Sequence, residues 1–147
     1  ALCPYDGRSQ GGFRRLMEEV WHYVTPGTRG VNSTKLFVPG ALRFARERGC
    51  ALVAKELPVP PVLKDRPDYQ SVLAFLRDMF SHDLPVAFLN LSNGALTNLD
   101  NWHWVTLVSA SGSRAAMYDQ ENRVVLDLRL WLETTLLGGA FVALSPA

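Results

Sequence analysis

The sequence lacks several features that would point to particular classes of protein. Its 15 basic and 14 acidic residues nearly cancel and form no basic stripe, so nothing predicts a nucleic-acid partner. No apolar run approaches the ~20 residues of a membrane-spanning helix, and no leader of charged, apolar and small residues opens the chain. No internal repeat or low-complexity segment is visible. We therefore expect no membrane and no nucleic acid among the partners.

Cysteine and histidine are scarce as well. The two cysteines, Cys3 and Cys50, have neither metal-site spacing nor the pattern of a disulfide framework, which favours a reducing, cytoplasmic setting. The three histidines, His22, His82 and His103, are far apart in sequence and belong to different predicted elements. They lack the spacing of a metal site, so we expect no metal and no cofactor.

Hydropathy patterns predict an α+β fold. Hydrophobic residues make up 48% and charged residues 20% of the 147 residues, as in a globular chain that fits one domain. Apolar residues recur at helical spacing in the first half, whereas short β-rich runs fill the second half. We expect a helical part over about 1–83 and an antiparallel sheet over about 84–147, with one helix inserted.

A β-hairpin is predicted for residues 101–119, where two β-rich arms flank a small turn. If Ala110–Gly112 form a three-residue loop, with Gly112 at positive φ, His103 and Asp119 lie level across the ladder. Alternation then also puts their side chains on one face of the sheet. A bulge at the loop would shift this register by one residue.

The paired histidine and aspartate suggest a catalytic role. A carboxylate beside an imidazole fixes its tautomer and stabilises its cation, which is the orienting half of a nucleophile–base–orienter triad. The alternative is a surface histidine near an unrelated aspartate. Asn101, Trp102 and Trp104 border His103, and the polar loop 92–101 leads directly to it. Because such loops often line sites, we expect these three neighbours to bind substrate.

Several stretches of the second half together resemble a known family. They include Asn-Trp-His-Trp-Val-Thr at 101–106, Met-Tyr-Asp at 117–119 and the apolar end at 138–144. With 84–89 and 126–131, they resemble the papain-like cysteine peptidases, especially the bacterial branch that cuts bacteriocin leader peptides after double glycine. The resemblance implies a papain-like fold and a peptide or protein substrate. It also implies that His103 is the general base and proton donor and that Asp119 orients it.

The sequence departs from this family at the nucleophile. The family's cysteine is usually followed by glycine at the start of a helix, with a glutamine upstream. Here Pro4 follows Cys3, and Gln10 lies after the cysteine, so we do not assign Cys3 as the nucleophile. We expect the catalytic cysteine outside this chain, in a domain that is incomplete at its N-terminus. The alternatives are an inactive, peptidase-like binding module or a transglutaminase-type acyl transferase. Nothing in the pattern predicts an oligomeric state.

Overall fold

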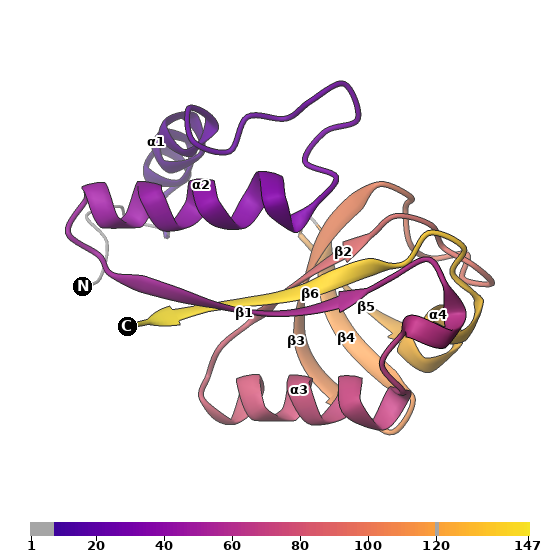
Figure 1. The fold of residues 1–147 in the computed structure, drawn as a ribbon. Helices are drawn as coiled ribbons and strands as arrows, with labels where there is room; N and C mark the ends of the chain where they lie inside the picture. The colour runs from indigo at the N-terminus through magenta and orange to yellow at the C-terminus, as the bar shows by residue number, and fades with distance from the viewer. Residues whose placement is uncertain (1–7, 120) are drawn as a thin grey trace. The chain divides into compact units, whose positions relative to one another are not determined.

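The computed structural model describes residues 8–119 and 121–147 (Figure 1). The predicted α+β class is confirmed, since two helices come first and six strands, with two further α-helices between them, form one antiparallel sheet. The first of these strands, Leu52–Val59, lies within the part over 1–83 that is predicted to be helical. Within the described residues, no helix has the length and apolar character that crossing a bilayer requires. The elements are α1 (Gln10–Trp21), α2 (Thr34–Glu47), β1 (Leu52–Val59), η1 (Leu63–Asp65), α3 (Tyr69–Ser81), β2 (Val86–Asn90), β3 (His103–Ser111), β4 (Arg114–Asp119), β5 (Asn122–Asp127), α4 (Leu128–Thr134) and β6 (Gly139–Pro146).

The chain divides into two compact units. One consists of residues up to Ala54 together with Ser145–Ala147, and the other is Lys55–Leu144. The organisation of the whole chain as a single domain stays a prediction. The second unit holds the predicted site and most of the sheet.

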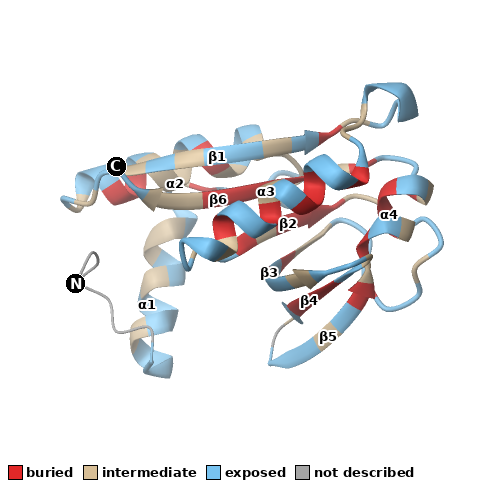
Figure 2. Cartoon of the chain, turned by 90° about the horizontal axis from the view of Figure 1, so that it is seen from below, coloured by how far each residue is buried: buried red, intermediate tan, exposed pale blue. Residues whose placement is uncertain are grey.

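In the first unit, α1 and α2 contact each other through polar and aromatic side chains. Arg48 pairs with Glu19 at 3.0 Å, and the ring of Tyr23 meets that of Phe44 edge-on at 5.4 Å. The amphipathic α1 has no buried residue, and Figure 2 accordingly shows no red on this helix. The apolar spacing that predicts α1 therefore corresponds to a half-exposed face rather than a core.

In the sheet, the strands lie in the order β1-β6-β2-β3-β4-β5. Strands β2 to β5 follow one another as an antiparallel meander, and β6 returns past α4 to pair with β2. Gly139 makes that pairing possible, because a Cβ there would lie 1.8 Å from the carbonyl oxygen of Leu89. Asp127 ends β5 and starts α4, since its carboxylate accepts a hydrogen bond from Leu130 N at 3.0 Å.

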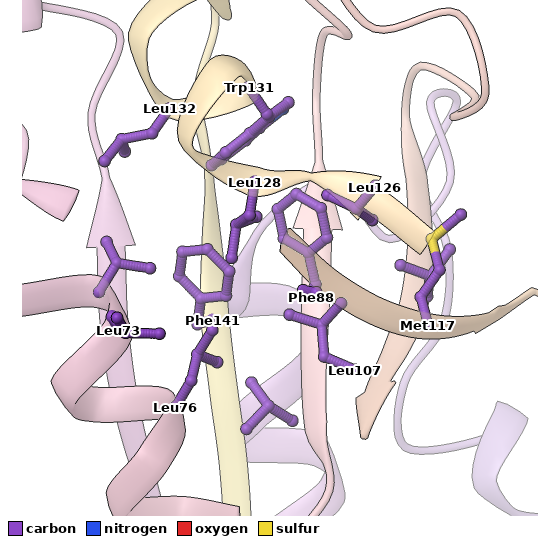
Figure 3. Packing of buried hydrophobic residues seen from close by; sticks show 14 of the residues in the cluster. Leu73, Leu76, Phe88, Leu107, Met117, Leu126, Leu128, Trp131, Leu132 and Phe141 are labelled. Atoms are coloured by element: carbon purple, nitrogen blue, oxygen red, sulfur yellow. The ribbon is translucent and has the colours of Figure 1, made fainter. Parts of the chain in front are cut away.

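The core of the second unit lies between the sheet and the helices α3 and α4. The ring of Phe88 stacks on Phe141 at 5.0 Å and meets Trp131 edge-on at 4.6 Å (Figure 3). Helix α3 contributes Leu73 and Leu76 from its buried side, which is red in Figure 2. Each such buried side chain adds roughly 1.5–3 kcal/mol of apolar transfer energy. The core thus fixes one face of β2, β3 and β4 against the helices.

A buried tyrosine ties α3 to the β3–β4 turn. The hydroxyl of Tyr69 donates a hydrogen bond to the carbonyl oxygen of Gly112 at 2.6 Å. Burial raises the pKa of Tyr69, and the nearby charge of Asp127 acts in the same direction. The neutral hydroxyl is therefore the form that suits the folded state.

We predict that Tyr69→Phe lowers the free energy of unfolding by about 1 kcal/mol, because a buried hydrogen bond to a backbone carbonyl is lost. Urea unfolding followed by circular dichroism measures the change. The matched control is Tyr118→Phe, since Tyr118 is an exposed tyrosine on the same hairpin.

The same variant has a pH signature. Since the folded pKa of Tyr69 is raised, its contribution to stability is present below the unfolded pKa of about 10 and is lost as the pH rises above that value. Between pH 9 and 11, stability should therefore fall less steeply in Tyr69→Phe than in the parent. Equal slopes for the two proteins would contradict this reading.

Candidate functional site

Three polar side chains gather at one end of the sheet. Asn90 is the last residue of β2, His103 the first of β3 and Asp119 the last of β4. Because neighbouring strands run antiparallel, the end of β2, the start of β3 and the end of β4 lie at the same end of the sheet. Asn90 pairs directly with His103. Alternation puts His103 on the same face of β3 as the buried Val105, so the site continues the core face toward solvent.

The predicted contact between histidine and aspartate is confirmed. Nε2 of His103 donates a hydrogen bond to Oδ1 of Asp119 at 2.8 Å, since an ionised carboxylate only accepts. The two side chains are 33% and 25% exposed, so solvent reaches them. With Nε2 protonated, a neutral ring keeps its lone pair on Nδ1, which is then the nitrogen free to act as a base. Four pockets of about 230–600 Å³ occur elsewhere among the described residues, and none of them is lined by this pair.

The predicted three-residue loop is wrong. Ser111 pairs with Arg114, which leaves a two-residue turn instead. Gly112 does adopt positive φ, at 59°, as predicted. The tighter turn fits the twist of the two strands, which two-residue hairpins match best. With this turn His103 and Asp119 are not level across the ladder.

A β-bulge compensates for the shorter turn. Strand β3 carries one extra residue, Val108, where the register shifts. If Val108 were paired in the ladder like its neighbours, the register set at the turn would bring Asp119 opposite Thr106, on the face away from His103. Because Val108 bulges out of the ladder, Thr106 pairs with Tyr118. Continuing this register by one residue places Asp119 opposite Val105, diagonal to His103 and on its face. Diagonal neighbours on one face are within reach of long side chains, as the 2.8 Å hydrogen bond shows.

Asn90 organises the loop that leads to His103. This side chain is fully buried, and its Nδ2 donates to Asp100 O at 2.7 Å and to Asn93 Oδ1 at 2.6 Å. Its Oδ1 accepts a hydrogen bond from Trp131 Nε1 at 2.8 Å. Sequence reasoning missed this role, although a polar residue that ends an otherwise apolar strand is a usable signal.

The three residues predicted to bind substrate lie in different settings. Asn101 is exposed, but its Oδ1 accepts a hydrogen bond from Asn93 N at 2.8 Å, so it helps to order the loop. Trp102 is 43% exposed and has a positive φ of 55°. Trp104 is partly buried and alternates to the face of β3 opposite His103. Their contact with a substrate stays a prediction.

Cys50 is the one cysteine among the described residues. Cys3 lies outside the described residues. Cys50 belongs to the other compact unit, where its Sγ lies 3.9 Å from the carbonyl oxygen of Arg48. His22 and His82 are both exposed.

His103 and Asp119 also belong to a group of three side chains, one imidazole and two carboxylates, that could bind a metal ion. One ligand atom each of Asp100, His103 and Asp119 lies within 4.8 Å of the other two. The sequence argument considered the spacing of cysteines and histidines and not that of carboxylates, so it did not group Asp100 with His103 and Asp119. The arrangement offers two kinds of chemistry, an oriented base and a set of ligands for a cation.

Comparison with known proteins adds no assignment to this geometry. The chain matches no family model, no curated protein and no solved structure. The site is therefore interpreted from its own residues.

We predict that Asn90→Asp destabilises the protein by about 3 kcal/mol. Aspartate has the same shape, but it replaces two donated hydrogen bonds by a carboxylate facing two oxygens in a buried position. Chemical unfolding measures the loss. The matched control is Asn98→Asp, since Asn98 is exposed and donates a single 3.0 Å bond to Val125 O. Similar costs for the two variants would show that Asn90 is not a special anchor.

We also predict that deletion of Val108 retains the hydrogen bond between His103 and Asp119. The pairs Leu107–Met117 and Ser109–Ala116 then become successive rungs of a regular ladder, and both faces stay the same. The Nε2–H proton of His103, shielded from exchange by the carboxylate, is the NMR readout. Loss of its signal in the deletion variant, as expected for Asp119→Ala, would disprove the register argument.

Proposed function

We propose that this chain carries the base and its orienting acid of a papain-like cysteine peptidase or amidase that cleaves peptide bonds. His103 is the general base and proton donor, and Asp119 orients it. The observation that carries the proposal is the 2.8 Å hydrogen bond from Nε2 to Asp119 at a partly exposed strand end.

The geometry suits this chemistry in three respects. Asp119 holds the ring by Nε2, so that Nδ1 is left to take a proton from a nucleophile. The carboxylate also stabilises the imidazolium that forms. The loop before His103 is fixed by Asn90, which keeps the ring in one place on a rigid strand end.

In the proposed reaction, His103 takes the proton of a thiol, and the resulting thiolate attacks the carbonyl carbon of the scissile amide. The imidazolium then gives this proton to the leaving amine, which departs and leaves a thioester on the sulfur. Water, activated by the now neutral His103, hydrolyses the thioester and releases the acid. No cofactor is needed for either half of the reaction.

The nucleophilic thiol of the proposed reaction is not identified among the residues around His103 and Asp119. Residues 55–144, which contain His103 and Asp119, include no cysteine. In our proposal the sulfur comes from another segment of the gene product. The lack of cysteine in this unit also favours the second candidate, a peptidase-like module that binds a peptide without cleaving it.

The test is the alkylation of thiols by iodoacetamide in the complete gene product that contains this chain. We expect one cysteine to react about tenfold faster than a free thiol at pH 6, because the imidazolium of His103 holds it as thiolate. His103→Ala should abolish the excess rate, and Asp119→Ala should reduce it. The matched control is His82→Ala, which removes an exposed histidine that is also near an aspartate, Asp78, at 3.7 Å.

Equal alkylation rates for every cysteine in the parent and in His103→Ala would refute a cysteine peptidase and leave the binding module. An acyl transferase would share the fast thiol. It is recognised by transfer of the acyl group to an added primary amine in preference to water.

A further inference from the structure

The acidic surroundings of His103 extend beyond its partner. Asp100 precedes β3 and is exposed, and one of its carboxylate oxygens joins His103 and Asp119 in the group within 4.8 Å. Two carboxylates thus face one imidazole at the open end of the sheet. The hydrogen bond between His103 and Asp119 uses only one of these two carboxylates.

The donor set matches a particular class of cation. Imidazole nitrogen suits first-row transition metals such as Zn²⁺, whereas Mg²⁺ and Ca²⁺ prefer oxygen alone. Tetrahedral ligands at about 2.0–2.2 Å from Zn²⁺ stand about 3.4 Å from one another. The group spans from 2.8 Å, between His103 and Asp119, to at most 4.8 Å. Rotation of the exposed Asp100 side chain, with a slight widening of the His103–Asp119 contact, brings the three ligands to the tetrahedral spacing.

The charge of the two carboxylates also favours a divalent cation at this position. Arg48, Lys55 and Arg129 form ion pairs with Glu19, Asp78 and Glu133, and none of these three cations pairs with Asp100 or Asp119. The two carboxylates therefore bring negative charge to the imidazole, and none of these three cations compensates it. A divalent cation compensates that charge at the point where all three ligands meet.

The backbone at the site is preorganised as well. The carbonyl of Asp100 is held by the buried Asn90, which is itself paired with His103 across the strands. Asp100 and His103 are thus fixed relative to each other through the backbone, while the carboxylate of Asp100 is exposed. Such support around the ligands is what allows a small site to hold a metal.

We propose that Asp100, His103 and Asp119 form a binding site for Zn²⁺, with a fourth position open to water. The bound ion takes the imidazole nitrogen and the carboxylate from each other. The proton displaced from Nε2 moves to Nδ1, so His103 no longer has a lone pair with which to act as a base. This inhibitory consequence rests on the function proposed above, whereas the binding does not.

The test is isothermal titration of the whole chain with zinc chloride, in a background of Cys3→Ser and Cys50→Ser because free thiols bind zinc themselves. We expect one Zn²⁺ per chain, and at least about tenfold weaker binding in Asp100→Asn, where an anionic ligand becomes neutral. His103→Ala should abolish binding. His82→Ala is the matched control, because His82 and Asp78 offer only two ligands, and its affinity should equal that of the background.

Binding of unchanged affinity in Asp100→Asn, or loss of binding in His82→Ala, would overturn the proposal. Asp100 is exposed, so its isosteric replacement tests the site even if variants of Asp119 fold poorly. The readout does not involve peptidase activity. Zinc binding that depends on Asp100 supports the site even if His103 activates no thiol, so the two proposals fail separately.

Discussion

The register between β3 and β4 is the constraint on which the site depends. Side chains alternate along a strand, so a shift of one residue would move Asp119 to the face of the sheet away from His103. The bulge takes Val108 out of the ladder, which offsets the one-residue shift that the two-residue turn at Gly112 would otherwise cause. The hydrophobic core benefits from the same shift, because it also brings Met117 opposite Leu107 on the buried face. Packing of the core and assembly of the polar pair therefore favour one register.

The ordered loop is the second element of the site. The amide group of Asn90 forms hydrogen bonds with three partners. Asn93 stabilises the loop as well, because its side chain donates a hydrogen bond to the carbonyl oxygen of Leu99. These bonds hold the chain at Trp102 in the left-handed region, which costs roughly 1–2 kcal/mol for a residue with a side chain. The strain lies directly before His103, where the chain turns from the loop into the strand.

Much of this architecture can be predicted from the sequence, and the remainder has identifiable causes. The helices, the strands and the shared face of His103 and Asp119 follow from hydropathy and alternation. The bulge does not, since a three-residue loop and a two-residue turn with a bulge give the same face from the same residues. The role of Asn90 depends on Trp131, which lies 41 residues further along the chain. The grouping of Asp100 with the pair likewise depends on how the loop folds. The papain-like fold itself stays a prediction.

The bond between Asn90 and Trp131 also bears on how the protein opens transiently. Trp131 is fully buried in α4, and its indole N–H donates both to Asn90 Oδ1 and to the carbonyl oxygen of Ser92, so opening the loop at these two residues leaves this N–H without a partner in the core. That penalty couples fraying of the loop to loosening of the helix. Backbone amides of the two segments should then exchange with deuterated solvent as one cooperative unit, although their sequence positions are far apart.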